Sequence, residues 1–456
     1  MIYGISDGMV MQRGTDNACD ITVSSDKKIR SVTTADNQTA KVTETPDGFR
    51  ITGILCGGPY TLNVDGEIFN DIYVGDVWIL AGQSNMQGCG RETSAERNTN
   101  PCVRALYMQG EWGIANNPLH ETGRSIYAVH TEVLGAKRGF SKRFAGPGLY
   151  FAQRMYELTS VPQGLICCAH GDTSLEQWSP SRRNLGTVGS LYAAMIESFR
   201  CAGSSVKGIF WSQGCNDTNI DRYKDYTKNT AELFGQMRAD MGKNLPIVYL
   251  QLSRCINDGK GGDIRPDTWN SVQEQQRTLF QRIGNADVIP TSACCLSDPY
   301  HISGKSHRIL GRSAAESMFC LIYGKLYGCV GSIKLKSVEY FDDDLSPDEF
   351  SVIVVTYDNV IGSLDGGVRP LGFALTESKC YDAHNYIISC ETDGNRVTIT
   401  AAAGRDKIEN MYLSYGMGFN PPCNIVDTNM RSLPIFEPIQ LNGILNFTNG
   451  AGNYEN

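Results

Sequence analysis

The chain has 456 residues, enough for about three domains of ordinary size. Its 41 basic and 49 acidic residues give a formal net charge of −8, which excludes a global positive field for nucleic acid or an anionic membrane. Charged residues make up 20% and hydrophobic residues 41% of the chain, so it can form cores and is not disordered as a whole.

The sequence carries no sign of export or of a membrane span. Its first residues, Met1 to Asp7, lack the basic and apolar regions of a signal peptide, and no stretch of about 20 apolar residues occurs. The 16 cysteines are too sparse for a disulfide scaffold, and none forms a C-x-x-C pair. We therefore expect a cytoplasmic protein with reduced cysteines and no membrane partner.

Three zones follow one another along the chain. Residues 1–75 and residues 329–456 alternate short apolar runs with turn signals, as antiparallel β regions do. Residues 76–328 alternate near-continuous apolar strands with amphipathic helices. This rhythm predicts an α/β domain with a doubly wound parallel sheet that is covered on both faces.

The strands expected in the α/β domain are 77–80, 164–168, 208–211, 247–250 and 287–289. The helices expected between them lie near 147–159, 189–201, 222–241, 268–283 and 304–322. The stretch 109–143 fits neither rhythm, so we expect an insertion that lines a site or a surface loop. Because ligands bind beyond the carboxyl ends of parallel strands, chemistry is expected directly after each strand.

Polar residues do follow these strands. Ser84 comes directly after the first strand in a Gly-Gln-Ser-Asn run, where it can be a nucleophile or simply begin a helix. Asp298 and His301 stand three residues apart on one loop, so the carboxylate can orient the imidazole. Taken alone, this spacing more often means a helix-capping aspartate beside a surface histidine.

Two further strands, 164–168 and 208–211, are followed by amide, glycine and histidine residues. Gln213 and Asn216 can donate amide hydrogens to an oxyanion or can form an ordinary turn. Gly171 allows its backbone N–H to approach a bound group closely. His170 competes with His301 as the base, but it has no local acid and is interpreted as a binding or core residue.

The order Ser, Gly, Asn, Asp-x-x-His resembles the four blocks of the SGNH hydrolase superfamily. Residues 75–86 resemble the nucleophile block of the sialate O-acetylesterases and related carbohydrate acetylesterases, and residues 146–154 and 171–178 resemble the next two segments of that family. Segments within 6–13, 57–62 and 415–436 also resemble the family. The resemblance implies a three-layer, doubly wound SGNH hydrolase domain over 76–328, flanked by β-rich regions over 1–75 and 329–456.

The resemblance also implies a serine esterase that removes O-acetyl groups from sialic acids and releases acetate through an acyl-enzyme, with no metal or cofactor. Ser84 is then expected to attack the acetyl carbonyl, His301 to take its proton and Asp298 to orient His301. The oxyanion donors expected are the backbone N–H groups of Ser84 and Gly171 and the Asn216 amide, with Gln213 as the alternative.

Two positions depart from the family pattern. Cys215 stands where relatives often carry a glutamate that has been assigned as the partner of the histidine. A neutral thiol cannot take that role, so either Asp298 or Asp217 must supply the carboxylate. Asp172 stands where a second glycine is usual, so only Gly171 carries over from that block.

An anionic sugar bound by an acidic chain needs a local cation. The candidate cations are Arg91, Arg124, Arg138, Arg143 and Arg265.

Three other residues are candidates for substrate contact: Gln83, His170 and Trp178. Core packing is at least as common for such a tryptophan ring.

Two alternative functions stay open. One is an acetylesterase for another acetylated carbohydrate such as xylan, and the other is a non-catalytic carbohydrate-binding relative, which the Cys215 departure suggests. The flanking β regions are expected to be packing modules, with carbohydrate-binding modules as the alternative.

Overall fold

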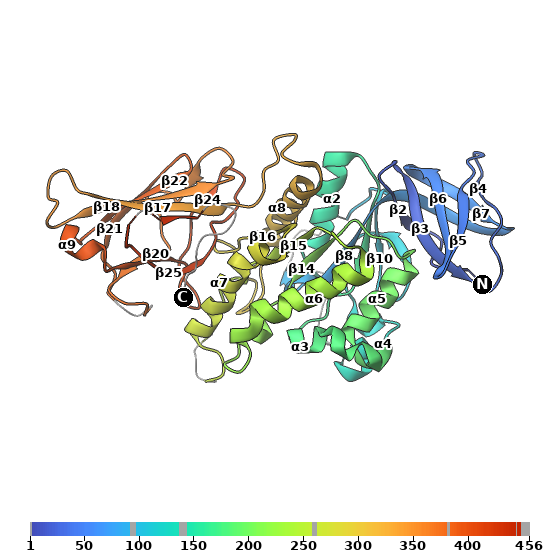
Figure 1. Ribbon diagram of the computed structural model, residues 1–456, viewed down its shortest axis with the longest axis horizontal. Helices are drawn as coiled ribbons and strands as arrows, with labels where there is room; N and C mark the ends of the chain where they lie inside the picture. Colours follow the sequence, from blue (N-terminus) through green and yellow to red (C-terminus); the bar gives the residue numbers. More distant parts are fainter. Residues whose placement is uncertain are drawn as a thin grey trace.

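The computed structural model describes residues 2–91, 97–135, 144–257, 262–380, 384–443 and 445–447. Along the long axis of the molecule, a central α/β domain lies between an N-terminal and a C-terminal β region (Figure 1). The α/β class that the sequence predicts is confirmed.

The central sheet has the strand order β11-β10-β13-β8-β14-β15-β16. All neighbours from β10 to β16 run parallel, and β11 at the edge is antiparallel to β10. The five predicted strands lie in β8, β13, β14, β15 and β16. The bounds are β8 (Glu67–Gly82), β10 (Val103–Leu106), β11 (Trp112–Ile114), β13 (Gln163–Cys167), β14 (Gly208–Ser212), β15 (Ile247–Leu250) and β16 (Ala286–Ile289).

Helices cover the sheet on both faces (Figure 1). The five predicted helices are present as α2 (Gly148–Thr159) and α8 (Gly304–Tyr323) over one face, and α5 (Leu191–Cys201), α6 (Tyr226–Met241) and α7 (Pro266–Ile283) over the other. Side chains of β8 alternate between the two cores, as the period of a strand requires. Val77, Ile79 and Ala81 join the core under α5–α7, and Trp78 and Leu80 join the core under α2 and α8.

Strand β8 is longer than predicted and joins the N-terminal region to the central sheet. Its first half pairs with β7 (Gly57–Val64) and β2 (Val10–Gln12), and its second half pairs with β13 and β14. Residue 75 therefore lies inside a continuous strand. The Arg13 guanidinium holds this junction with two hydrogen bonds of 2.9 Å to the fully buried Asp76 carboxylate.

The rest of the N-terminal region is antiparallel. Its second sheet has the order β1-β3-β6-β5, and β4 pairs with β7. The bounds are β1 (Ile2–Tyr3), β3 (Ala18–Ser25), β4 (Val32–Thr34), β5 (Lys41–Thr45) and β6 (Gly48–Leu55).

The C-terminal region contains a five-stranded sheet, β21-β22-β18-β17-β26, and a three-stranded sheet, β20-β23-β25, around a core of its own. The bounds are β17 (Lys334–Asp342), β18 (Ser351–Asp358), β20 (Phe373–Thr376), β21 (Ile387–Asp393), β22 (Arg396–Ala401), β23 (Tyr412–Tyr415), β25 (Phe436–Gln440) and β26 (Leu445–Asn446). Shorter elements are β9 (Gly90–Arg91), β12 (Phe144–Ala145), β19 (Leu364–Asp365), β24 (Val426–Asp427), α3 (Leu175–Trp178), α4 (Gly186–Gly189) and α9 (Arg405–Ile408).

Two buried amide side chains bind the C-terminal region to the central domain. Gln251 donates to Ile435 O at 2.8 Å and accepts from Ile435 N at 3.0 Å. Asn270 accepts from Gly418 N at 2.8 Å and donates to Gly418 O at 3.3 Å. Both amides are 1% exposed, so removal of the C-terminal region would leave buried polar groups without these partners. This arrangement favours a packing role over that of a detachable module.

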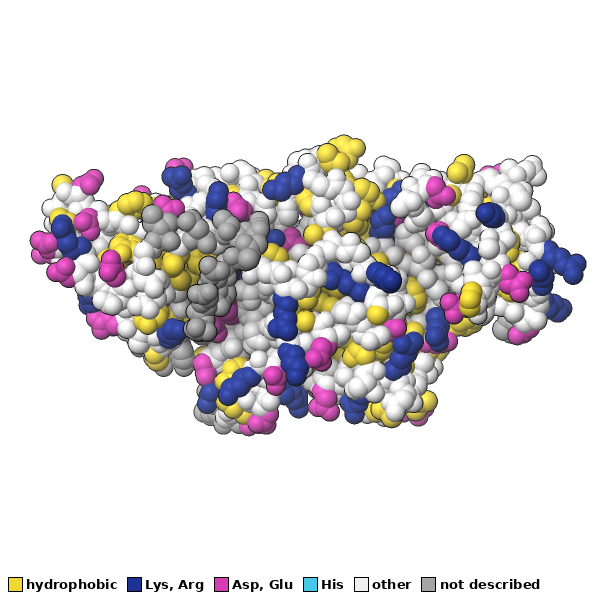
Figure 2. All heavy atoms as spheres, viewed as in Figure 1, with side chains coloured by type: hydrophobic (Ala, Val, Ile, Leu, Met, Phe, Trp, Pro, Cys, Tyr) yellow, Lys and Arg dark blue, Asp and Glu magenta, His cyan; other side chains and the backbone are white. Residues whose placement is uncertain are grey.

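The surface is mixed in character. Figure 2 shows basic and acidic side chains interspersed across one face of the molecule, with apolar side chains scattered among them.

All 16 cysteines are free thiols, of which Cys295 and Cys380 are exposed. Within the described ranges, no helix has the length and apolar content needed to cross a bilayer.

The close approach of β8 to β14 makes a prediction about Gly82. Its φ of 125° is unfavourable for other residues, and an added Cβ would lie 2.1 Å from Ser212 O. We expect Gly82→Ala to destabilise the fold by more than about 3 kcal/mol, because backbone strain and overlap add. Thermal denaturation followed by circular dichroism measures this. Gly235→Ala on α6, where an added Cβ meets open space, is the matched control and should be neutral or stabilising.

A second prediction concerns two carboxylates where β25 meets α7. Burial, together with Glu274, raises the pKa of Glu437 to about 7, despite the opposing effect of Lys379 and Arg277. Unfolded glutamate loses its proton near 4.5, so this group costs stability as the pH rises from 4.5 to about 7. Glu437→Gln should therefore raise the melting temperature at pH 8 and change it little at pH 4.5. Equal effects at both pH values, or an equal effect of Glu391→Gln at an exposed site, would contradict this.

Candidate active site

Ser84 is the first residue of the short helix α1 (Ser84–Gln87), directly beyond the end of β8. Gln83 N–H donates to Ser212 O at 2.8 Å, which fixes the turn between the strand and the helix. Ser84 is 8% exposed, so it is recessed but reachable. As the first residue of a helix, its backbone N–H has no intrahelical acceptor, and it finds none elsewhere in the described part of the chain.

Asp298 and His301 form the pair that their spacing predicts. His301 Nδ1 lies 2.9 and 2.8 Å from the two carboxylate oxygens of Asp298. Asp298 Oδ1 also accepts the backbone N–H groups of Tyr300 and His301, which closes the loop into a compact turn. Burial raises the pKa of Asp298, but these hydrogen bonds outweigh it and leave the pKa below its usual value. The carboxylate is therefore ionised and fixes His301 with Nε2 available for proton transfer.

The loop that carries Asp298 and His301 is attached to helix α1. Asn85 Oδ1 accepts the backbone N–H of Ile302 at 3.0 Å, which joins the neighbour of Ser84 to the neighbour of His301. Asn85 and Ile302 also line one small cavity together with Gln83 and Gln213. No hydrogen bond joins the side chains of Ser84 and His301, both of which are described; catalytic contacts commonly tighten when substrate binds.

Gly171 lies beside the nucleophile, as expected for an oxyanion donor. A Cβ at this position would be 3.4 Å from Ser84 Cβ and 2.9 Å from Gln87 Oε1. Its backbone N–H, however, already donates to Gln87 Oε1 at 2.6 Å. Gly171 can serve an oxyanion only if this hydrogen bond changes its acceptor.

Asn216 keeps a hydrogen available for a ligand. One amide hydrogen goes to Asp172 Oδ1 at 3.0 Å, and Asn216 Oδ1 accepts from Gln83 Nε2 at 3.3 Å. Gln83 also accepts the backbone N–H of Gly214 at 3.0 Å and is buried. Gln83 therefore ties the turn before Ser84 to the Asn216 loop, and its contact with substrate stays a prediction.

Gln213 and Asp217 belong to a buried support network. Gln213 Nε2 donates to Thr173 O at 3.1 Å and to Asp217 Oδ2, which uses both of its amide hydrogens. Asp217 Oδ2 also accepts the backbone N–H of Leu175 at 3.0 Å. Gln213 thus lacks a hydrogen for an oxyanion in this structure. Asp298, and not Asp217, is the carboxylate that contacts His301.

Cys215 does not replace a catalytic acid. Burial raises the pKa of its thiol to about 12, so the sulfur stays protonated and neutral. Burial also raises the pKa of Asp217, which is consistent with its role inside the network.

Two candidates for substrate contact, Trp178 and His170, lie in the core, which is the alternative that the sequence left open for both. Trp178 is fully buried, packs edge-to-face on Trp211 at 5.3 Å and donates to Thr173 Oγ1, so it presents no face to a sugar. His170 is also fully buried, with Nδ1 2.9 Å from His130 Nδ1. Burial and His170 lower the pKa of His130 to about 3. The sequence analysis did not single out His130, and its one signal there is its place in the irregular 109–143 stretch. Through His170, His130 joins the π-helix Val129–Val133 to the loop that contains Gly171.

The arginine candidates separate clearly. Arg124 pairs with Glu121 at 3.0 Å and Arg265 pairs with Asp267 at 2.7 Å, so neighbouring acids already neutralise both. Arg91 lies at the site, because its backbone N–H donates at 2.8 Å to Ser297, the residue before Asp298. Its side chain makes no ion pair with the described acidic residues. Arg138 and Arg143 lie outside the described residues.

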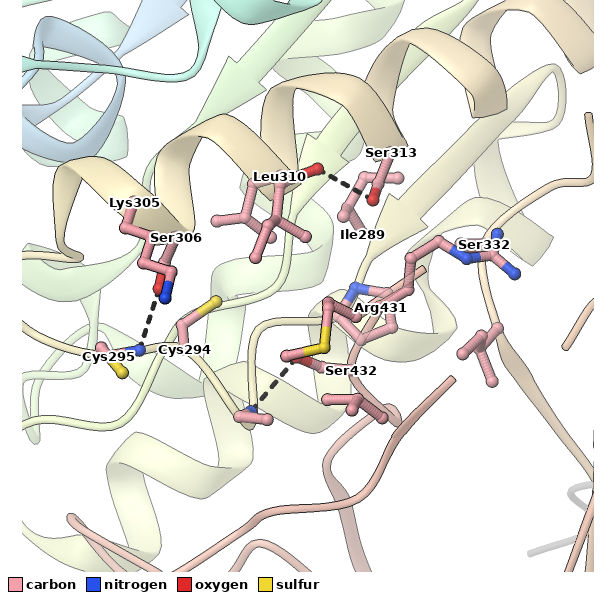
Figure 3. A pocket seen from close by; sticks show the side chains of 16 residues that line it. Ile289, Cys294, Cys295, Lys305, Ser306, Leu310, Ser313, Ser332, Arg431 and Ser432 are labelled. Carbon is pink, nitrogen blue, oxygen red and sulfur yellow. Dashed lines mark hydrogen bonds between the residues drawn. The ribbon is translucent and has the colours of Figure 1, made fainter. Parts of the chain in front are cut away.

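A larger cavity of about 120 Å³ lies between α8 and the C-terminal region. Figure 3 shows Lys305, Ser306 and Leu310 of α8 on one side and Arg431 and Ser432 on the other. Neither Ser84 nor His301 lines it, so it is separate from the candidate active site. Across the described ranges, His, Cys, Asp and Glu side chains form no group of three or more that could hold a metal ion.

Comparisons with known proteins identify the family of the chain. Residues 74–320, more than half of the chain, match the family described as carbohydrate esterase, sialic acid-specific acetylesterase. The chain belongs to this family. A probable carbohydrate esterase of Arabidopsis thaliana is 28% identical over 294 residues, which cover 58% of this chain and 99% of that protein. Human sialate O-acetylesterase is 27% identical over 180 residues, a third of each chain.

The structural likeness to a known protein extends beyond residues 74–320, which match the family. A carbohydrate acetylesterase from Xanthomonas citri superposes with a TM-score of 0.69 over 95% of this chain and 98% of that chain, at 22% identity. The likeness therefore includes both flanking β regions.

The role of the acid is open to a direct test. We expect Asp298→Asn to lower kcat/KM about 10²–10⁴-fold in an acetate-release assay, because the orienting charge on His301 is lost. Since the pKa of Asp298 is lowered, its stabilising contribution is complete above the unfolded value of 3.8 and is lost as the pH falls below it. The difference in melting temperature between wild type and variant should therefore be constant from about pH 5 to 7 and shrink below pH 3.8. Full activity of the variant would remove Asp298 from the mechanism.

Proposed function

We propose that the protein is a serine esterase that removes O-acetyl groups from sialic acids. The observation that carries the proposal is the Asp298–His301 pair, held beside the Ser84 helix by the Asn85–Ile302 hydrogen bond. We assign the parallel sheet with helices on both faces to the three-layer SGNH hydrolase arrangement, which sets these groups at one edge of the sheet.

The reaction is proposed to run in two steps. Ser84 Oγ attacks the acetyl carbonyl carbon while His301 Nε2 takes the hydroxyl proton, and the sugar oxygen leaves with that proton to form the acetyl-enzyme. Water then attacks the acetyl carbon with His301 as base, releasing acetate and restoring Ser84. The developing oxyanion is met by the Ser84 N–H and the second Asn216 amide hydrogen, with Gly171 joining if Gln87 releases its N–H.

The substrate proposal rests on the family description and on Arg91. A carboxylate on the sugar needs a cation near the ester, and Arg91 lies one hydrogen bond from the residue before Asp298. Because the chain carries a net charge of −8, an arginine at this place, which forms no ion pair with the described acidic residues, gives an anionic sugar a local attraction.

A nucleophile variant provides the primary test. Ser84→Ala should lower acetate release from O-acetylated sialic acid to background while leaving the circular dichroism spectrum and the melting temperature close to wild type. A serine-reactive fluorophosphonate should label wild type and not the variant. Acetate release by Ser84→Ala at the wild-type rate would refute the mechanism.

A second experiment decides the sugar. Arg91→Ala should raise KM for O-acetylated sialic acid about tenfold or more, because a charge-assisted contact is lost, and leave the KM for acetylated xylan oligosaccharides unchanged. Arg124→Ala is the matched control and should change neither. Equal turnover of both substrates by wild type and by Arg91→Ala would favour the second candidate, an esterase for neutral acetylated carbohydrates. That candidate draws on the plant relative, which is described as a probable carbohydrate esterase with no sugar named and which this chain matches over 99% of its length.

A further inference from the structure

A short segment of the C-terminal β region, Gly416–Asn420, lies against the loop that follows β15. Cys255 N–H donates to Phe419 O at 2.7 Å, and the Phe419 ring meets Trp269 of α7 edge-on with centroids 6.2 Å apart. Gly418 is held at both its N–H and its carbonyl by the buried Asn270 amide. The segment is therefore fixed to the central domain at successive residues.

The loop that follows β15 also contacts the loop that carries Asp298 and His301. Ile256 N–H donates at 2.7 Å to Pro299 O, and Pro299 lies next to Asp298. Two consecutive backbone N–H groups therefore bond to different regions: that of Cys255 to Phe419 in the C-terminal region, and that of Ile256 to Pro299 in the loop that carries Asp298 and His301. A single peptide unit thus connects the two regions.

Arg254 makes a second connection in parallel. Its Nε donates to Cys294 O at 3.2 Å, at the start of the segment that leads to Asp298, and its Nη1 donates to Asn420 Oδ1. Arg254 forms no ion pair with an acidic side chain in the described ranges, so its charge serves these two oxygen atoms. The rigid guanidinium fork gives both bonds a defined geometry.

We propose that Asn420 is a positioning residue for catalysis: through Arg254, and with the Phe419 carbonyl acting through Cys255, it keeps the Asp298–His301 loop aligned with Ser84. The C-terminal region thereby completes the active site without contributing a reacting group. The inference rests on the proposed esterase mechanism. Because it concerns alignment and not sugar recognition, it applies to any acetyl ester that Ser84 attacks.

The test compares three variants of the full-length protein on 4-nitrophenyl acetate. Asn420→Ala removes the acceptor for Arg254 at an exposed position and should lower kcat about tenfold while KM changes less than about twofold, because a misaligned base slows the step without weakening binding. Asn420→Asp keeps an oxygen for Arg254 and should restore kcat to near wild type. Asn429→Ala, at another exposed site of the same region, is the matched control and should leave kcat unchanged.

A spectroscopic readout follows the same alignment without turnover. The Nδ1 proton that His301 shares with Asp298 should give a low-field ¹H signal, assigned by its loss in His301→Gln. In Asn420→Ala this signal should broaden or disappear, and in Asn420→Asp it should return. A role in general stability alone would lower the melting temperature and leave the signal and kcat in place.

The outcomes separate the two proposals. An unchanged kcat together with an unchanged low-field signal in Asn420→Ala would overturn the positioning role while the esterase function stands. A rise in KM alone, or a failure of Asn420→Asp to restore the signal, would overturn it as well. If wild type cleaves no ester at all, the proposed function fails, and the low-field signal still decides whether Asn420 aligns His301.

Discussion

The contact between β8 and β14 at Gly82 is the constraint on which the site depends. The chain turns out of the central strand at this point, and the absence of a side chain lets the Ser212 carbonyl lie where a Cβ would stand. The turn delivers Ser84 to the start of α1 and leaves its N–H without an intrahelical acceptor. The same turn therefore positions both the proposed nucleophile, the Ser84 hydroxyl, and one proposed oxyanion donor, the Ser84 N–H.

The groups around this turn are held by amide side chains more than by charges. Asn85, Gln87 and Gln83 each use an amide group to join helix α1, or the turn before it, to a neighbouring loop. Gln213 joins the loop after β14 to Thr173 and Asp217 in the same way. Amides can donate and accept at once, so they lock loops in place while leaving the local charge to Asp298 and its histidine. Burying an amide side chain costs free energy unless its hydrogen-bond partners are present. The same holds for Gln251 and Asn270, whose partners Ile435 and Gly418 belong to the C-terminal region, so this region contributes to the stability of the central domain.

Much of this could be predicted from local patterns. The apolar runs mark the parallel strands, and the spacing of Asp298 and His301 places an acid and a base on one loop, because both signals depend on residues close in sequence. The Gly171 N–H is satisfied by Gln87, 84 positions away, and the Trp178 ring is covered by Trp211, so neither outcome is visible locally. The junction near residue 75 was hidden for a different reason. Asp71, with φ of 59°, and Gly75 interrupt the strand pattern although the strand continues through them.

The uninterrupted course of β8 has a consequence for how this sequence can vary in length. Val77, Ile79 and Ala81 face one core and Trp78 and Leu80 face the other, and the strand is paired on both edges. One residue inserted ahead of them would turn every one of these side chains to the opposite face of the sheet, so the two sets would exchange cores. A single-residue insertion or deletion within this part of β8 should therefore disrupt both cores, and the distance from the Arg13–Asp76 junction to Ser84 behaves as a fixed length in this protein.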